Sequence, residues 1–277
     1  MRPIPVLADG GGELEYLRTP DGMDLAFRVA GPESAPAVVL THGVSMDQRM
    51  WESQIDSLSE RYRVIVHDVR GHGQSPCRPD QFTPRAAASD LIALLDEVKA
   101  ARAALVGHSL GGAISQIAAL EQPARLSAFV GIGCACITMK PSLTMRVFSS
   151  VAAPVARGMG PARMREDTAR RAGVHPATRE YARDAAAQMD DEMFARAVSV
   201  GFGDYAAVPG YHIGVPLLLM QGASDGYRPL LSSAVSWAKR DGGAYLLVPD
   251  AAHNAGQDNP AFVNEHLLAF LDSALGG

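Results

Sequence analysis

The stretch Ala103-Ala104-Leu105-Val106-Gly107-His108-Ser109-Leu110-Gly111-Gly112 decides how this chain is interpreted. Four apolar residues lead into Gly107-His108-Ser109-Leu110-Gly111, which fits the pattern G-x-S-x-G, and a helix-like run over 112–120 follows at once. A buried strand, a tight turn and a helix are the context in which this pattern exposes a serine hydroxyl. Gly107 and Gly111 let neighbouring backbone pass close to the turn, and the helix start directs free N–H groups to the same place. Ser109 is therefore a candidate nucleophile, with an incidental serine in a glycine-rich turn as the alternative.

The composition is that of a globular protein with a large core. The chain has 277 residues, of which 47% are hydrophobic and 20% charged, and its formal net charge is −5. This charge favours neither nucleic acid nor an anionic membrane as a partner. Cys77, Cys134 and Cys136 lack metal-site spacing, so free thiols are expected. No signal peptide or membrane span is evident, and the cytoplasm is the expected location.

The apolar pattern alternates between short strand-like runs and helical stretches. Leu14–Arg18 and Met23–Ala30 form a predicted hairpin, and the further strand predictions are Ala37–Thr41, Arg63–His67, Ala103–Val106, Ala128–Ile132, Val215–Met220 and Ala244–Val248. The helix predictions among them are Gln48–Glu60, Pro84–Val98, Leu110–Glu121, Leu230–Arg240 and Pro260–Ala274. Continuous apolar runs are typical of strands buried on both faces. The alternation predicts an α/β fold with a mostly parallel eight-stranded sheet flanked by helices.

One segment, residues 137–212, interrupts this alternation. It carries no strong strand signal, and helix-like runs are predicted over Ser142–Val155, Ala162–Ala172, Thr178–Gln188 and Asp191–Val200. We interpret it as a helical insertion that divides a core domain of residues 1–136 and 213–277. Six of the eleven methionines fall here, among them Met139 and Met145. Methionine usually fills cores, but near a site it could line an apolar pocket, so Met139 and Met145 are candidate substrate contacts.

A serine hydroxyl needs a neighbouring base, and histidine suits this task because it can accept and return a proton near neutral pH. Of the eight histidines, His253 follows the last predicted strand and precedes the last helix. Loops after parallel strands meet at the carboxyl edge of the sheet, which places His253 near Ser109. His42 and His108 lie in glycine turns, where structural hydrogen bonding is the expected role. His42 and the neighbouring Ser45 are also candidate substrate contacts.

The histidine in turn needs an acid that fixes its tautomer. Asp225 follows the strand predicted over Val215–Met220, and the order Ser109, Asp225, His253 matches the order that this architecture requires. Asp250, three residues before His253, is the alternative acid.

An oxyanion in the reaction needs two backbone donors. Leu110, directly after the candidate nucleophile, supplies one N–H. The second is expected from His42-Gly43-Val44-Ser45, after the strand over Ala37–Thr41. Val44 is the preferred donor there, and Ser45 remains an alternative.

Taken together, these segments resemble the α/β-hydrolase fold family. The resemblance rests on His42-Gly43, on Asp68-Val69-Arg70-Gly71-His72-Gly73-Gln74-Ser75, on Gly107 to Gly112, on Gly222 to Asp225 and on His253. It runs from about Leu14 to Leu275 and implies a helical cap over residues 137–212. It also implies hydrolysis without a cofactor or metal. Two departures are Ala252, where a glycine often precedes the histidine, and Val44-Ser45-Met46, where Phe-Pro often follows His-Gly.

The serine at position 109 favours acyl transfer, because family members that resemble haloalkane dehalogenases and epoxide hydrolases carry aspartate there. We expect an esterase or lactonase that cleaves an ester, lactone or thioester of a small to medium, largely apolar substrate through an acyl-enzyme. The same triad resembles that of carbon–carbon bond hydrolases of ring-cleavage products and of cofactor-free perhydrolases. A ligand receptor that keeps the triad without turnover is an alternative of another class. The sequence indicates no particular oligomeric state.

Overall fold

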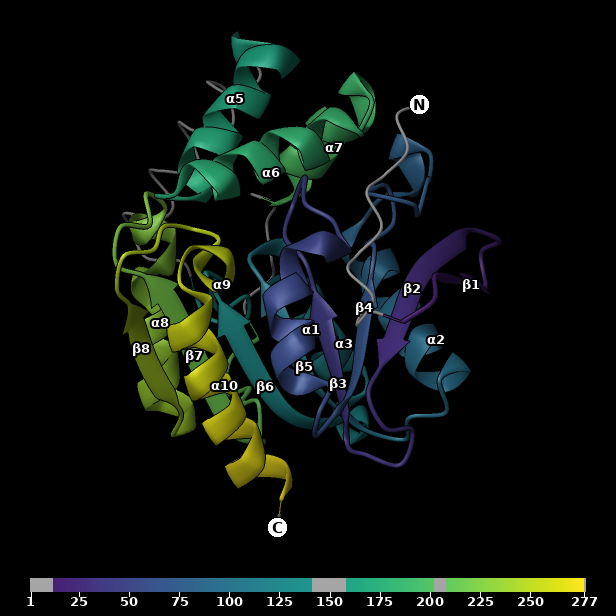
Figure 1. Ribbon diagram of the computed structural model, residues 1–277, viewed down its shortest axis with the longest axis vertical. Coiled ribbons are helices and arrows are strands. Elements are labelled where there is room, and N and C mark those ends of the chain that lie inside the picture. Colours follow the sequence, from purple (N-terminus) through teal and green to yellow (C-terminus); the bar gives the residue numbers. More distant parts are fainter. Residues whose placement is uncertain (1–11, 141–157, 202–207, 277) are drawn as a thin grey trace.

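The computed structural model describes residues 12–140, 158–201 and 208–276. One eight-stranded sheet forms its centre, with the spatial order β1-β2-β4-β3-β5-β6-β7-β8 (Figure 1). The strands are β1 Glu15–Arg18, β2 Asp24–Ala30, β3 Ala37–Thr41, β4 Arg63–His67, β5 Ala103–His108, β6 Leu126–Ile132, β7 Leu217–Gly222 and β8 Ala244–Val248. β2 pairs antiparallel with β1 and β4, and the other neighbours pair in parallel. The predicted fold class is confirmed.

Helices cover both faces of the sheet. They are α1 Glu52–Leu58, α2 Pro84–Glu97, α3 Leu110–Glu121, α5 Pro161–Ala172, α6 Pro176–Ala187, α7 Asp191–Gly201, α8 Arg228–Asp241, α9 Ala255–Asp258 and α10 Pro260–Leu275, with short 3-10 helices at Gln48–Trp51, Pro79–Gln81 and Pro123–Arg125. The predicted helix over Gln48–Glu60 is divided into the first of these 3-10 helices and α1. The prediction over Ser142–Val155 lies outside the described residues. The three other helices predicted in the insertion correspond to α5, α6 and α7.

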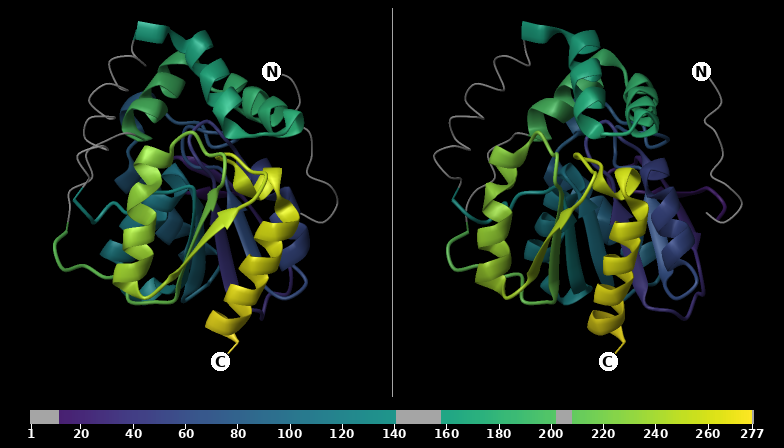
Figure 2. Two further views of the ribbon diagram at one scale, coloured as in Figure 1. Left: turned by 90° about the vertical axis from the view of Figure 1, so that its left-hand side faces the viewer. Right: turned by 60° about the vertical axis from the view of Figure 1, so that its left-hand side comes forward.

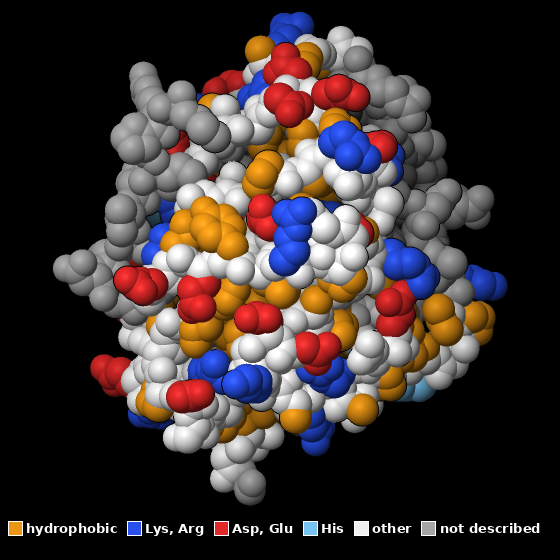
Figure 3. All heavy atoms as spheres, turned by 90° about the vertical axis from the view of Figure 1, so that its right-hand side faces the viewer, with side chains coloured by type: hydrophobic (Ala, Val, Ile, Leu, Met, Phe, Trp, Pro, Cys, Tyr) orange, Lys and Arg blue, Asp and Glu red, His pale blue; other side chains and the backbone are white. Residues whose placement is uncertain are grey.

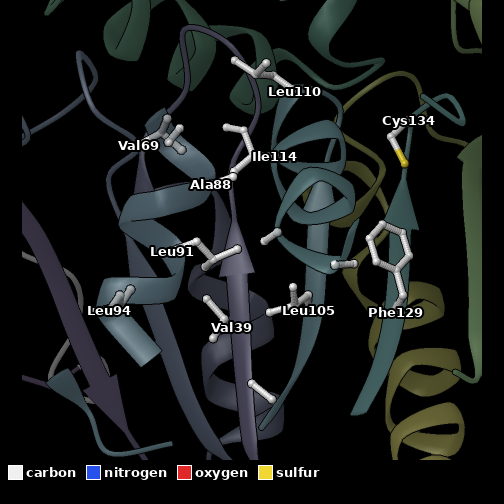
Figure 4. Close-up of a cluster of buried hydrophobic side chains, with 14 of the residues drawn as sticks. Val39, Val69, Ala88, Leu91, Leu94, Leu105, Leu110, Ile114, Phe129 and Cys134 are labelled. Atoms are coloured by element: carbon white, nitrogen blue, oxygen red, sulfur yellow. The ribbon is translucent and has the colours of Figure 1, made fainter. Parts of the chain in front are cut away.

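Each face of the sheet carries its own apolar cluster. One contains Leu91 of α2 and Ile114 of α3, which lie over Val39 and Leu105 (Figure 4). The same cluster contains Trp237 of α8, whose ring meets that of Phe129 of β6. The other contains Ile55 of α1 and Leu267 of α10. α8 and α10 accordingly lie on opposite sides of the sheet (Figure 2). β3, β5 and β7 are buried along their whole length, as their continuous apolar sequences predict. β8 departs from this pattern because it is an edge strand, and Leu247 is half exposed.

The strand order creates a topological switch at the carboxyl edge of the sheet. β3 lies between β4 and β5, and the chain leaves β3 toward one face, through α1, and leaves β5 toward the other, through α3. Thr41 of β3 pairs in register with Gly107 of β5, so the loops that follow start side by side. In open α/β sheets ligands bind at this kind of position. α5, α6 and α7 lie across the same edge (Figures 1 and 2).

Two further observations concern the charges on the surface and the apolar character of the helices. On the face that Figure 3 shows, acidic and basic side chains are interspersed with apolar ones and are not gathered by sign. None of the helices formed by the described residues has the length and apolar character needed to span a bilayer.

Candidate active site

Ser109 occupies a strained turn between β5 and α3. Its φ of 50° and ψ of −113° are uncommon for a residue with a side chain, and the turn is held by a hydrogen bond of 2.9 Å from the Ser109 N–H to the Ile132 carbonyl. A Cβ atom on Gly111 would lie 2.1 Å from the Thr41 carbonyl oxygen, and one on Gly107 would lie 2.5 Å from Gly112 Cα. Only glycine therefore fits at these two positions, and the close packing keeps the strained backbone in place.

The side chains of Ser109, His253 and Asp225 lie in one hydrogen-bonded chain. His253 Nε2 is 3.0 Å from Ser109 Oγ, and His253 Nδ1 is 2.9 Å from Asp225 Oδ2. Because a carboxylate only accepts, the Nδ1–H donates to Asp225, and Nε2 is left to accept the serine proton. Three loops that follow β5, β7 and β8 supply these residues. The arrangement can transfer a proton from the serine to the imidazole.

Asp225 is suited to stay ionised although its side chain is completely buried. Burial alone would raise the pKa of Asp225, but the adjacent His253, by charge and hydrogen bond, and the Tyr227 N–H outweigh burial and lower it. The Tyr227 N–H donates to Oδ1 over 2.8 Å, while Oδ2 faces His253. Asp250, the alternative acid, is exposed. The geometry therefore favours Asp225.

His108 and His42 are buried and support the site from behind. The His108 Nε2–H donates to the His253 carbonyl over 3.0 Å. His42 donates from Nδ1 to the Gly43 carbonyl over 2.8 Å and accepts the Val69 N–H at Nε2 over 2.9 Å. Burial lowers the pKa of His42 to about 4 and that of His108 to about 3, so both rings are neutral near pH 7. These histidines fix the loops that carry Gly43 and His253.

The loop after β3 packs against the turn at Ser109. A Cβ atom built on Gly43 would lie 3.3 Å from Ser109 Cβ and 2.5 Å from His108 Nδ1, so the loop packs directly on the turn. Among the described residues, the recorded hydrogen bonds use neither the N–H of Val44 nor that of Leu110. Val44 follows Gly43 in this loop, and Leu110 follows Ser109 at the start of α3.

The predicted substrate contacts lie at different depths. His42 and Ser45 are both fully buried, both ring nitrogens of His42 are occupied, and Ser45 turns the loop with a φ of 58°. Both residues shape the loop after β3, and their predicted contact with substrate stays a prediction. Met139 is half-buried and packs on the apolar cluster that contains Leu110, which leaves its predicted contact untested. Met145 lies outside the described residues.

Sequence reasoning missed three side chains around this site. The ring of Tyr227 meets that of His253 edge to face, with 4.7 Å between centroids. Asp258 accepts the N–H of Ala252 over 2.8 Å and that of Val174, between α5 and α6, over 2.9 Å. Tyr181 of α6 contacts Asp47 after β3. Each contact joins residues that are remote in the sequence, so no local sequence pattern predicts it.

Within the described ranges, no group of three or more His, Cys, Asp or Glu side chains is placed to hold a metal ion. The three cysteines are free, as predicted: Cys134 and Cys136 are buried and Cys77 is half-buried.

Comparison with known proteins agrees with this architecture. A family model described as "alpha/beta hydrolase fold" matches residues 36–260. The chain is 35% identical over 104 residues to 3-oxoadipate enol-lactonase 1 of Acinetobacter baylyi, a match that covers 38% of this chain and 39% of that protein. The matched stretch is therefore well under half the length of that relative.

Two solved structures are similar over nearly the whole chain. The enol-lactonase from Burkholderia xenovorans LB400 has a TM-score of 0.77 at 25% identity and covers 93% of this chain and 99% of its own. A thermophilic esterase from Thermogutta terrifontis has a TM-score of 0.81 at 23% identity, with 95% and 99% covered, and supports the fold alone. The family model, the sheet order and the serine turn lead to one conclusion: this chain belongs to the alpha/beta hydrolase fold family.

Proposed function

We propose that this protein is a serine hydrolase that cleaves an ester, lactone or thioester of a small to medium, largely apolar molecule. The observation that carries the proposal is the chain of hydrogen bonds from Ser109 Oγ through His253 to Asp225, over 3.0 and 2.9 Å. Similarity to an enol-lactonase adds support for ester-type bonds. Val44 and Leu110, the chain neighbours of Gly43 and Ser109, carry apolar side chains that belong to the cluster on that face of the sheet, which favours an apolar substrate.

The mechanism follows from the donors and acceptors in place. His253 Nε2 takes the Ser109 proton while Oγ attacks the carbonyl carbon, and the oxyanion is stabilised by the N–H groups of Val44 and Leu110. The imidazolium then protonates the leaving oxygen or sulfur, and an acyl-serine remains. Water attacks this acyl group with His253 as base, which releases the carboxylic acid and restores the serine. Asp225 stays ionised and holds the imidazole in the required tautomer.

We infer that residues 137–212 form a cap over the site, with the core made of residues 1–136 and 213–277. The position of α5, α6 and α7 across the carboxyl edge of the sheet supports this division (Figure 2). The free cysteines fit a reducing compartment such as the cytoplasm.

The carbon–carbon bond hydrolase alternative is less well supported, because it needs free cationic side chains to hold a substrate carboxylate. Arg165, Arg170 and Arg171 of α5 are each paired with an aspartate. Of the other arginines in the first part of the insertion, Arg163 is exposed, and Arg146 and Arg157 lie outside the described residues. The non-catalytic receptor remains as an alternative that predicts no turnover in the following assay. The perhydrolase also remains, and peracid formation after addition of hydrogen peroxide to the same assay distinguishes it.

The test is hydrolysis of a panel of p-nitrophenyl esters, five-membered lactones, acyl thioesters and ring-cleavage dienoates by the wild type and Ser109→Ala. We expect turnover of at least one ester-type substrate by the wild type and loss of that turnover in the variant. Ser115→Ala is the matched control, because Ser115 lies on α3 and its Oγ is buried without a partner among the described residues. Retained hydrolysis in Ser109→Ala, or turnover of dienoates alone, contradicts the proposal.

A further inference from the structure

The hydroxyl of Tyr181 holds the backbone of Asp47, three residues after Val44. It donates to the Asp47 carbonyl over 3.0 Å, and the Asp47 N–H donates to it over 3.0 Å. Tyr181 belongs to α6, which lies 134 residues further along the chain. One phenol therefore binds both polar groups of a single peptide residue in the loop that follows β3.

Arg49 reinforces the contact between Tyr181 and Asp47, because it binds the Asp47 carboxylate and lies over the Tyr181 ring. Arg49 binds the Asp47 carboxylate through Nε at 3.0 Å and through a second nitrogen at 2.7 Å, and it reaches Asp184 of α6 at 2.9 Å. Its guanidinium also lies 5.5 Å from the centroid of the Tyr181 ring. Asp47 is 3% exposed and the Arg49 side chain 13%, so water screens the ion pair between them little.

The anchored loop has few other supports. Between Gly43 and Asp47 the recorded backbone bond is a turn from the Met46 N–H to the Gly43 carbonyl, over 3.3 Å. Ser45, inside that turn, has a φ of 58°, a sparsely populated conformation that persists only when surrounding contacts hold it. Asp47 also caps the 3-10 helix Gln48–Trp51: its carbonyl accepts the Met50 N–H over 3.1 Å and its carboxylate the Arg49 N–H over 3.0 Å. The Gln48 N–H donates to buried Asp68 over 2.8 Å. Tyr181 ties this capped residue to α6 and so helps to hold the end of the loop that carries the Val44 N–H.

We propose that Tyr181 is a positioning residue for the oxyanion-binding loop and that α6 thereby takes part in setting the rate of the reaction. This inference rests on the proposed function, in which the Val44 N–H stabilises the oxyanion. Such a donor acts only when it points at the place where charge develops, and loss of one donor costs about 100- to 1000-fold in kcat. Loosening the loop without removing the donor is expected to cost less, about tenfold.

Tyr181→Phe removes the hydroxyl and keeps the ring, so it tests the contact alone. The matched control is Tyr62→Phe, which removes a hydroxyl bonded to Asp272 of α10 over 2.6 Å. Tyr181→Phe loses both hydrogen bonds to the Asp47 backbone and Tyr62→Phe loses one, each from a half-buried or buried tyrosine. Only Tyr181 contacts the loop at residues 43–47. Hydrogen exchange of peptides that cover residues 42–50, kcat and KM for a p-nitrophenyl ester, and active-site titration are measured for both.

We expect faster exchange over residues 42–50 in Tyr181→Phe and a kcat per titrated site about tenfold lower at unchanged KM, because an oxyanion donor acts on the transition state. Tyr62→Phe should leave both values at the wild-type level. Unchanged exchange in Tyr181→Phe, or a loss of activity explained entirely by fewer titrated sites, overturns the proposal.

A second variant is used if Tyr181→Phe does not fold. Arg49→Lys loses the hydrogen bonds from two guanidinium nitrogens to Asp47 and should show smaller changes of the same kind in exchange and kcat. Wild-type exchange and kcat in Arg49→Lys overturn the proposal. Absent ester turnover in the wild type overturns the proposed function instead, and the exchange data still decide whether Tyr181 holds the loop.

Discussion

Replacing Asp225 by asparagine should disable the site without disturbing its shape. In the wild type Oδ1 accepts the Tyr227 N–H over 2.8 Å and Oδ2 accepts the His253 Nδ1–H over 2.9 Å. An asparagine side chain has one oxygen, and this oxygen is expected to accept the Tyr227 N–H, whose position is fixed by the backbone. Its NH₂ group then faces His253 Nδ1, which must become an acceptor. The imidazole proton moves to Nε2, so that the nitrogen facing Ser109 can no longer take the serine proton.

The size of the effect follows from this change of tautomer. In serine triads the equivalent substitution lowers kcat by about 10,000-fold, which corresponds to about 5 kcal/mol in the activation free energy. The assay is kcat/KM for the best p-nitrophenyl ester, with circular dichroism to verify folding. Asp250→Asn is the control, because Asp250 is exposed and asparagine tolerates its left-handed φ of 51°. A folded Asp225→Asn that retains a tenth of wild-type activity, or a large loss in Asp250→Asn, would refute the reasoning.

Two predictions concern the packing and the titration of the site. Gly111→Ala should strongly destabilise the fold, because the new Cβ would lie 2.1 Å from the Thr41 carbonyl oxygen; Gly226→Ala, whose Cβ would meet only Arg171 at 3.6 Å, should be tolerated, and equal urea midpoints for the two variants would contradict this. Acid should destabilise the protein through buried histidines: burial lowers the pKa of His67, His72 and His108 to about 3 and that of His42 to about 4, so below their ordinary 6.5 the unfolded chain takes up protons that the folded chain excludes. Each such histidine contributes a slope of about 1.4 kcal/mol per pH unit between pH 6.5 and 4, partly opposed by Asp68, whose pKa burial raises to about 6. Urea unfolding from pH 7.5 to 5 measures the slope of the free energy of unfolding with pH. His67→Gln removes one of these groups, so the number of protons taken up on unfolding should fall by about one. Stability that does not change with pH over this range would contradict this prediction.

The sheet could be predicted closely from local pattern. Six continuous apolar runs and a hairpin correspond to the eight strands, because short continuous apolar runs are typical of strands in a parallel sheet. The partial exposure of β8 could not be predicted from its sequence, Ala-Tyr-Leu-Leu-Val, since burial there depends on its place at the edge of the sheet.

The candidate site was also predictable only in part. Ser109, Asp225 and His253 could be located because each follows a strand, and the carboxyl ends of parallel strands meet. The burial of His42 and Ser45 depends on how the loop after β3 folds back on Val69 and Ser109, which local sequence does not encode. The contacts of Tyr181 and Asp258 join the insertion to core loops, and they emerge only once α5 and α6 are placed.

The most direct test of the account is to trap the intermediate on Ser109. A rapid acid quench of the protein with a p-nitrophenyl ester, followed by peptide mass spectrometry, should show one acyl group on the peptide that contains Ser109. A burst of p-nitrophenol close to one equivalent per active site should accompany it if deacylation is slow, and a fluorophosphonate should label the same serine. Sustained turnover with an adduct on another residue, or fluorophosphonate labelling that persists in Ser109→Ala, would contradict the account.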